Sequence, residues 1–369
     1  MNKIVAIQTP HYAPNYGAQL QAFALGTAIK QMGYQIEYIN RRPNFEKKGT
    51  LLAKFLFYLE KKTKLKGFGE FEKKYLQPQT FPFYSNDDYS KIDVNSYYAF
   101  VVGSDQIWRD DYFHFSFEYA PYLYYVPKGG AKKIAYAASF GKENCIHPLE
   151  RNEKIRNLMS DFKAISVREK SGVNILKDSF GINDGTWVAD PTLLHEGNFY
   201  VSTFQLTEKP SSVLVTYILG RDINKMNKVK QIADNLKIKM LNIYQLDCFA
   251  FLGQRLSGIL NRLKKVPSVT KWLELILNAE YVITDSFHGM VFCILFHKQF
   301  VVLNNTKGGT ERYTSLLGKL GIIDRLLNWN VGEQEIQKKL REPINYSIVD
   351  RKIKDFRDFS RLFLKEALD

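Results

Sequence analysis

Cysteine is scarce in this chain, with three among 369 residues. Cys145, Cys248 and Cys293 lie far apart and form no CxxC pair. Disulfide frameworks and cysteine-based zinc sites need several cysteines at close spacing. The sequence therefore predicts neither a disulfide scaffold nor a cysteine metal site, and we expect no bound metal.

Long apolar runs are absent as well. No uninterrupted apolar stretch reaches the roughly 18 residues that a membrane-spanning helix needs. Met1-Asn-Lys3 leads directly into the strand-like Ile4-Val-Ala-Ile7, without the organisation of a signal peptide. We therefore expect a cytoplasmic protein.

The common nucleotide-binding signatures are also absent. The loop His11 to Gly17 precedes a helical pattern, but it has neither the GxGxxG spacing of a dinucleotide fingerprint nor the GxxxxGK of a P-loop. NAD and ATP bound through these motifs are disfavoured, and we expect no resident cofactor.

Positive charge is plentiful, with 52 Lys and Arg against 38 Asp and Glu and a net charge of +14. Such an excess indicates anionic partners. Nine lysines and three glutamates lie between Lys47 and Lys74, interleaved with aliphatic and aromatic residues. The segments Leu51 to Lys66 and Phe249 to Lys265 thus suit a peripheral contact with an anionic membrane, although ordinary surface helices give the same pattern. No nucleic-acid motif is present, and we expect no nucleic-acid partner.

Strand and helix patterns alternate along the chain. The predicted strands are Lys3–Gln8, Gln35–Asn40, Tyr98–Val102, Lys133–Ala137, Ala164–Val167, Thr186–Val188, Val213–Ile218, Lys239–Ile243, Tyr281–Ile283 and Gln299–Leu303. Two of the predicted helices matter below, Ala18–Met32 and Met290–Phe296. The alternation predicts an α/β protein with two Rossmann-like domains facing across a cleft.

The predicted domains follow from this order. Residues 1–195 form the N-terminal Rossmann-like domain, with a basic amphipathic insert near 45–75. Residues 196–335 form the C-terminal Rossmann-like domain, and residues 336–369 form a helical segment packing back across both.

Polar loops follow several predicted strands, at the edge where open α/β sheets bind ligands. Asp105 offers a carboxylate suited to a general base on a sugar hydroxyl, or to capping a helix. Arg168 can grip a carboxylate or a phosphate, or form an ion pair with a nearby acid. His288 lies in a predicted strand-to-helix turn with Ser286 and Gly289, where an anion can be held; the alternative is a capping or core histidine.

Five motifs in this order carry a resemblance. They are Asn15-Tyr-Gly-Ala-Gln-Leu-Gln-Ala-Phe-Ala-Leu25, Val102-Gly-Ser-Asp-Gln-Ile-Trp108, Ser166-Val-Arg-Glu-Lys-Ser-Gly172, Asp190-Pro-Thr192 and Thr284-Asp-Ser-Phe-His-Gly289. Together they resemble the polysaccharide pyruvyltransferase family over roughly Lys3 to Gly321. The resemblance implies a GT-B-like fold, phosphoenolpyruvate as donor, a pyruvate ketal on a sugar of a cell-surface polysaccharide as product, and release of phosphate.

The resemblance also assigns residues. His288 matches the essential histidine of the family, Arg168 its phosphoenolpyruvate-binding arginine, and Asp105 lies in its acidic loop. We predict His288 and Asp105 as catalytic, with the roles of acid and base left open. The predicted donor-binding set is Arg168, Ser286, His288, Gly289 and Arg312, and the predicted acceptor or cleft loop comprises Asn15, Tyr16, Gly17 and Ser104.

The resemblance implies an acceptor carried on a polyprenyl lipid at the inner face of the plasma membrane, which would give the basic segments a purpose. Two other functions stay open at this point. One is a GT-B glycosyltransferase that uses a nucleotide sugar, and the other is a non-catalytic binding protein of the same fold.

Overall fold

The computed structural model describes residues 3–42, 55, 58–60, 62–63, 65–109, 119–144, 149–220, 223–243, 266–304 and 309–369. The chain divides into two compact units. Unit 1 comprises residues 1–49, 72–195 and 353–369, and unit 2 comprises residues 50–71 and 196–352. The predicted basic segment 249–265 lies outside the described residues, as does much of the insert near 45–75.

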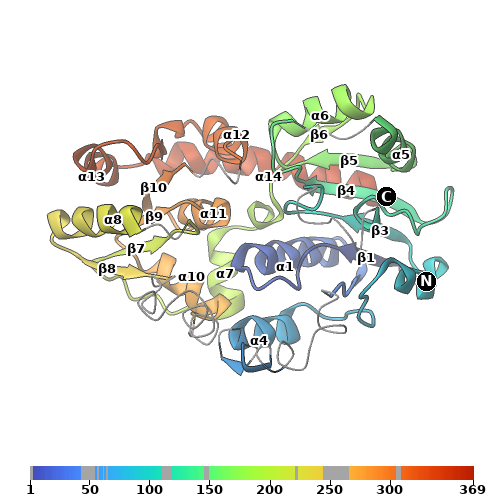
Figure 1. Ribbon diagram of the computed structural model, residues 1–369, viewed down its shortest axis with the longest axis horizontal. Helices are drawn as coiled ribbons and strands as arrows, with labels where there is room; N and C mark the ends of the chain where they lie inside the picture. The colour runs from blue at the N-terminus through green and yellow to red at the C-terminus, as the bar shows by residue number, and fades with distance from the viewer. Residues whose placement is uncertain are drawn as a thin grey trace. The chain divides into compact units, whose positions relative to one another are not determined.

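Unit 1 contains a six-stranded sheet with the order β2-β1-β3-β4-β5-β6, in which every neighbouring pair is parallel. Its strands are β1 (Ile4–Gln8), β2 (Gln35–Tyr38), β3 (Ala99–Val102), β4 (Lys132–Ala138), β5 (Ala164–Val167) and β6 (Thr186–Trp187). Its helices are α1 (Tyr16–Gln31), α5 (Leu149–Met159) and α6 (Lys170–Phe180), with 3-10 turns η1 (Asn86–Lys91), η2 (Val94–Ser96), η4 (Ala120–Tyr122) and η5 (Pro191–Leu194). Figure 1 shows α1 in dark blue beside β1, and α5 and α6 in green beside β5 and β6.

Unit 2 contains a five-stranded parallel sheet with the order β11-β10-β9-β7-β8. Its strands are β7 (Val213–Tyr217), β8 (Lys239–Asn242), β9 (Tyr281–Thr284), β10 (Gln299–Leu303) and β11 (Leu326–Leu327). Its helices are α7 (Gly197–Phe204), α8 (Ile223–Leu236), α10 (Val269–Leu277), α11 (Phe287–Leu295), α12 (Glu311–Leu320) and α13 (Glu333–Arg341), with the 3-10 turn η8 (Ile323–Arg325). Helices α4 (Lys66–Tyr75) and α14 (Tyr346–Leu368) each contain residues of both units.

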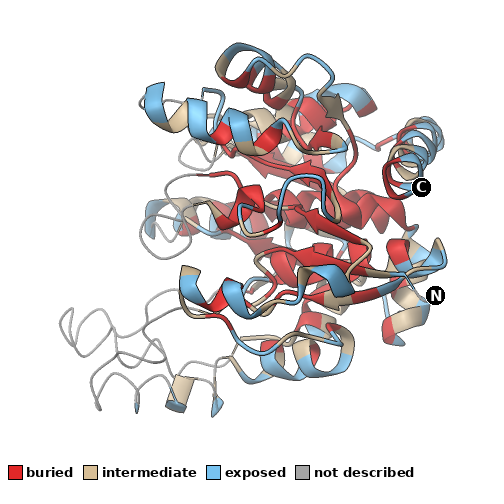
Figure 2. Cartoon of the chain, turned by 90° about the vertical axis from the view of Figure 1, so that its right-hand side faces the viewer, coloured by how far each residue is buried: buried red, intermediate tan, exposed pale blue. Residues whose placement is uncertain are grey.

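The inner strands of the two sheets are buried on both faces, which explains their mostly apolar sequences. All four residues of β3 are buried, and so are all but the first residue of β1 and of β4. Parallel sheets covered by helices have this pattern, whereas a half-solvated sheet alternates polar and apolar residues. Figure 2 shows the strands in red, as buried, and most of the outward helical surface in pale blue, as exposed.

Two helices begin earlier than the sequence predicted. Helix α1 begins at Tyr16 and not at Ala18, and α11 begins at Phe287 and not at Met290. In each case a polar side chain just before the helix accepts the N–H of the residue three positions later. Asn15 accepts the N–H of Ala18, and Ser286 accepts the N–H of Gly289. Such capping lets a helix start ahead of its apolar stripe. His288 therefore lies in the first turn of α11, and not in the turn that precedes it.

These same two helices are almost wholly buried. Thirteen of the 16 residues of α1 and all nine residues of α11 are buried. A helix that is apolar on all sides belongs in a core. The loops that lead into α1 and α11 are therefore anchored on one side by a buried strand and on the other by a buried helix. Among the described residues, no helix is both long and apolar enough to span a membrane.

Candidate functional site

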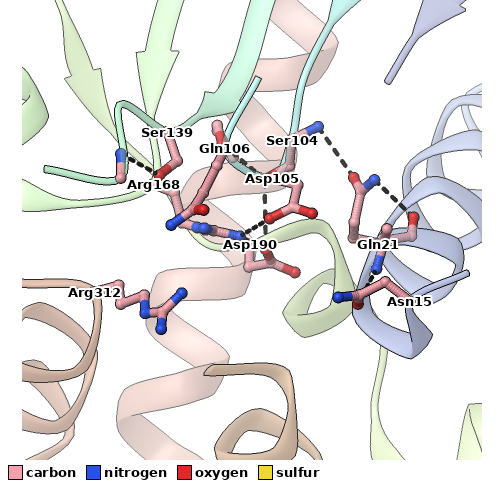
Figure 3. A network of polar contacts seen from close by, with 12 residues as sticks. Asn15, Gln21, Ser104, Asp105, Gln106, Ser139, Arg168, Asp190 and Arg312 are labelled. Carbon is pink, nitrogen blue, oxygen red and sulfur yellow. Dashed lines mark hydrogen bonds and ion pairs between the residues drawn. The ribbon is translucent and has the colours of Figure 1, made fainter. Parts of the chain in front are cut away.

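A buried arginine organises the carboxyl edge of the sheet in unit 1. Arg168 directly follows β5, and its side chain is 2% exposed. Its Nε lies 3.1 Å from Oε1 of Glu169, and its Nη1 lies 3.1 Å from Oδ2 of Asp190 and 3.5 Å from Oδ1 of Asp105. Figure 3 shows Asp105, Arg168 and Asp190 converging from three different loops. One guanidinium thus holds together the loops after β3, β5 and β6.

The charges around Arg168 differ from those expected of a donor-binding residue. Burial alone lowers the pKa of Arg168, but the carboxylates of Glu169, Asp190 and Asp105 outweigh this effect and raise the pKa above its usual value. A buried cation surrounded by three carboxylates has little attraction left for a further anion. That Arg168 grips phosphoenolpyruvate stays a prediction, which these contacts do not favour. The alternative of an ion pair with nearby acids matches the observed contacts, although the ion pair is buried.

Asp105 is the accessible member of this network. Its side chain is 22% exposed, compared with 6% for Glu169 and 0% for Asp190. Its backbone adopts φ +58°, a left-handed conformation that aspartate tolerates better than most residues. The carbonyl oxygen of Asp105 accepts the N–H groups of Ile107 and Ser139, which fixes the turn. The carboxylate is thus held by Arg168 at the edge of a buried network.

The loops after β1 and β3 are joined by Gln21, a residue that the sequence analysis did not select. The Gln21 side chain donates to Oγ1 of Thr9 at 2.6 Å and accepts the N–H of Ser104 at 3.1 Å. Gln21 is completely buried in α1. A long polar side chain inside an otherwise apolar helix was the available signal, because such a group must find partners. Gln21 connects the first sequence motif to the loop that carries Asp105.

The predicted acceptor residues of unit 1 have internal partners. Asn15 caps α1, and Tyr16 and Gly17 are buried in its first turn. The Ser104 hydroxyl donates to the carbonyl oxygen of Ala137 at 2.7 Å, and Ser104 is completely buried. The structure therefore brings Ser104 next to Asp105, whereas the other three residues form the start of α1. Their contacts indicate that they shape the loop.

In unit 2, a second site forms where β9 passes into α11. The Ser286 hydroxyl accepts the N–H of Gly289 at 3.3 Å. A Cβ at Gly289 would approach Oγ1 of Thr284 to 2.6 Å, so only glycine lets the helix lie this close to its strand. His288 is the second residue of α11 and is 7% exposed. Its ring packs edge-on against the ring of Phe287, with 5.2 Å between the two ring centroids. Ser286, His288 and Gly289 are thus together at a helix N-terminus, which favours anions.

Asp285 connects this helix start to the neighbouring strand. Its carboxylate accepts the N–H groups of Leu219 at 2.5 Å and Gly220 at 3.1 Å, both in the loop after β7. Burial raises the pKa of Asp285, while those two N–H groups and the charges of Lys225 and Arg312 oppose the rise. The buried Asp285 carboxylate therefore links the start of α11 to the loop after β7.

Arg312 lies near the start of α12 and is connected to Asp285 through Tyr313. Its Nη2 donates to the Tyr313 hydroxyl at 2.7 Å, and that hydroxyl donates to the carbonyl oxygen of Asp285 at 2.6 Å. The Nε of Arg312 is buried and has no hydrogen-bond partner among the described residues. A buried N–H of this kind is costly unless a ligand or a water accepts it. The structure thus brings Arg312 together with the His288 loop through Tyr313 and Asp285.

Several contributors to both sites were missed. Glu169 and Asp190 contact Arg168, and Asp285 is acted on by Arg312 and by Lys225, but none of these four newly found residues was selected. Asp190 and Asp285 lie inside two of the five motifs. The sequence therefore indicated their positions but not their partners. Among the described residues, no group of His, Cys, Asp and Glu side chains has a geometry suited to a metal ion.

Solved structures resemble this chain in fold. UGT89C1 from Arabidopsis thaliana matches with a TM-score of 0.55 at 8% identity, covering 99% of this chain and 98% of that one. A putative UDP-N-acetylglucosamine 2-epimerase from Listeria monocytogenes matches with a TM-score of 0.53 at 12% identity, covering 100% and 91%. The glycotransferase of kitacinnamycin matches with a TM-score of 0.51 at 10% identity, covering 100% and 99%. These likenesses and the two parallel sheets confirm the predicted α/β, GT-B-like fold.

No curated protein matches the chain. The model of the polysaccharide pyruvyl transferase family matches residues 15–307, which is well over half of the chain and includes all five motifs. The predicted resemblance is thereby confirmed, and the chain belongs to the polysaccharide pyruvyl transferase family.

Proposed function

We propose that this enzyme transfers the pyruvyl group of phosphoenolpyruvate to two hydroxyls of a sugar in a cell-surface polysaccharide precursor, forming a pyruvate ketal and releasing phosphate. The observation that carries the proposal is the grouping of His288, Ser286, Gly289 and Arg312 at the start of α11 and α12. A helix N-terminus and a guanidinium are suited to the carboxylate and phosphate of the donor. Family membership supports a pyruvyl donor and a polysaccharide acceptor.

The chemistry requires one proton donor and one proton acceptor. Protonation of the donor methylene makes C2 electrophilic, and a sugar hydroxyl then attacks C2 and loses its proton. A second hydroxyl of the same sugar displaces phosphate from C2 and closes the ketal, and its proton leaves with the phosphate. His288 serves as the acid or as the partner of the phosphate, and Asp105 accepts the hydroxyl proton.

Arg168 takes a different part in the proposal from the one that the resemblance implied. Its contacts with Asp105, Glu169 and Asp190 support a positioning role, in which the guanidinium fixes the carboxylate of Asp105. Arg168 then acts through Asp105 and not by contact with the donor. Ser104, whose N–H and hydroxyl are both engaged, supports the same turn.

We further propose that the acceptor is attached to a polyprenyl carrier and that the protein works at the cytoplasmic face of the membrane. The described part of the basic insert supports a peripheral contact, since Phe55 and Tyr58 are 56% and 55% exposed and the ammonium of Lys62 lies 5.7 Å from the Tyr58 ring centroid. Exposed aromatic residues beside lysines suit the lipid headgroup layer. Flotation with anionic liposomes at low salt tests this, and a Phe55→Ser, Tyr58→Ser variant that floats like the wild type would contradict it.

A rival function is supported by the fold. Three of the similar structures are described as bound to UDP or UDP-GlcNAc, so a nucleotide sugar is the main alternative donor. Calorimetric titration of the protein with phosphoenolpyruvate, UDP and pyruvate distinguishes the two. We expect binding of phosphoenolpyruvate alone, about 10- to 100-fold weaker in Arg312→Met, because a charge-assisted hydrogen bond is lost. Lys319→Met, an exposed lysine on the same helix, is the control. Binding of UDP without phosphoenolpyruvate would overturn the proposal.

A further inference from the structure

Unit 2 has a second cation next to the candidate donor site. Lys225 lies in the first turn of α8, and its Nζ is 4.5 Å from the centroid of the Trp329 ring. Trp329 is itself held in place, because Nζ of Lys228 donates to its carbonyl oxygen at 2.8 Å. A cation packed on an aromatic face has fewer rotamers available than one in open solvent. Lys225 is therefore a fixed charge, and nothing in the sequence patterns had indicated it.

Lys225 and Arg312 act on the same carboxylate. The charges of both cations act on Asp285, Lys225 from α8 and Arg312 from α12. A Cβ built on Gly220 would lie 3.4 Å from Oδ2 of Asp285 and 3.6 Å from Nζ of Lys225. The ammonium and the carboxylate thus approach the same glycine, and glycine places no side chain between them.

Among the described residues, Asp285 is the carboxylate on which both cations act, and it already accepts two backbone N–H groups. The start of α11 follows Asp285 directly and adds the partial positive charge of a helix N-terminus, roughly half an elementary charge. The Nε of Arg312 is buried and has no hydrogen-bond partner among the described residues. Two cations, this N–H group and a helix N-terminus together favour a bound anion.

We propose that Lys225 and Arg312 form a two-cation clamp for the phosphate group of the donor, with Asp285 as the shared counter-ion between them. This inference rests on the proposed function, in which phosphate is the leaving group, and it adds Lys225 as a substrate-binding residue. A phosphate has several outer oxygens and can be approached from two sides, by the compact ammonium and by the planar guanidinium. The clamp also stabilises the charge that grows on phosphate as its bond to C2 breaks.

The test compares four proteins in calorimetric titrations with phosphoenolpyruvate, inorganic phosphate and UDP. They are the wild type, Lys225→Met, Lys225→Arg, and Lys230→Met as a control on an exposed position of the same helix. Circular dichroism establishes that each variant is folded. We expect Lys225→Met to bind phosphoenolpyruvate and phosphate about 10- to 100-fold more weakly, Lys225→Arg to recover most of the affinity, and Lys230→Met to match the wild type.

The outcomes separate the clamp from the donor assignment. If the wild type binds phosphoenolpyruvate and Lys225→Met binds it within twofold, the clamp is wrong while the proposed function stands. If the wild type binds UDP only, and Lys225→Met loses that affinity, the clamp stands and the donor assignment fails. A wild type that binds none of the three anions, or a Lys230→Met variant that loses as much affinity as Lys225→Met, overturns the clamp.

Discussion

The two sheets carry sites with inverted charge. In unit 1, the buried guanidinium of Arg168 contacts three carboxylates. In unit 2, the buried carboxylate of Asp285 accepts two backbone N–H groups, and the charges of Lys225 and Arg312 act on it. Both sites lie at the carboxyl edge of a parallel sheet, beside a buried helix with a polar cap. The same local architecture therefore holds a buried cation among carboxylates in unit 1 and a buried carboxylate beside cations in unit 2.

This inversion matches the two substrates of a pyruvyl transfer. A sugar hydroxyl is neutral and needs a proton acceptor, whereas an enolpyruvyl phosphate is a multiply charged anion and needs cations. We expect acceptor activation to depend on unit 1 and donor binding to depend on unit 2.

The largest expected effect is on turnover. Asp105→Asn removes the proposed base, and we expect kcat to fall by about 10²- to 10⁴-fold. The affinity for phosphoenolpyruvate should stay within twofold of the wild type, because the donor site lies in the other unit. Steady-state phosphate release with isolated acceptor and calorimetric binding of the donor measure the two quantities. Asp87→Asn, an exposed aspartate of unit 1, should change neither.

The next effect is on stability and compares the two arginines. Arg168→Met leaves three carboxylates around an uncharged side chain, and we expect a loss of about 3–5 kcal/mol in the free energy of unfolding. Arg312→Met loses one hydrogen bond to Tyr313, and we expect about 1 kcal/mol. Urea unfolding of both variants measures the difference. Similar losses for the two would contradict the contrast drawn between the sites, and Arg168→Lys should lie between wild type and Arg168→Met.

Acid should destabilise unit 1 through two histidines. Burial lowers the pKa of His11 and of His195 to about 4, against about 6.5 in the unfolded chain. Between these values the unfolded chain binds protons that the folded one does not. The stabilisation is therefore fully present above about pH 6.5 and is lost as the pH falls to about 4, with about 2 kcal/mol lost per histidine at pH 5.

Urea titrations at pH 7 and pH 5 measure this loss. His11→Gln should reduce the difference between the two pH values, because the variant has no imidazole to protonate at this position. An unchanged pH dependence in His11→Gln would show that the histidine is not buried in its neutral form.

The smallest effect compares the two helix caps. Asn15→Ala and Ser286→Ala each remove a capping acceptor, and each should cost about 1 kcal/mol of stability. Only Ser286→Ala should also weaken phosphoenolpyruvate binding, because only its helix is proposed to hold the donor. Equal donor affinity in both variants would reduce Ser286 to a structural cap.

Much of the fold could be predicted because a buried parallel strand is recognisable as a short apolar run. Ala164–Val167 and Gln299–Leu303 occur in the structure with the predicted bounds. The helix starts at Tyr16 and Phe287 were missed, because the apolar pattern begins later than the capped turn. Local periodicity thus locates the body of an element better than its polar ends.

The candidate site was less predictable, because its electrostatics depend on partners that are distant in sequence. Arg168 had the right type and position for an anion-binding residue, yet Asp190 lies 22 positions away and Asp105 comes from another loop. Which residues Arg168 contacts could be known only from the strand order β3-β4-β5-β6. Lys225 belongs to no motif, and its proximity to Asp285 depends on β7 and β9 being neighbours.

The contacts of α14 have a consequence for the order in which the chain is completed during synthesis. The N–H of Ala189 donates to the Ser360 hydroxyl, 171 positions later, and Arg357 donates to the carbonyl oxygen of Leu193. The segment that carries Asp190 therefore cannot form these hydrogen bonds until residues near the end of the chain have been synthesised. At about 5–20 residues per second, the delay is roughly 10 to 35 s. All of residues 196–352 have been made by then, so the unit that is begun first is the last to obtain its full set of contacts.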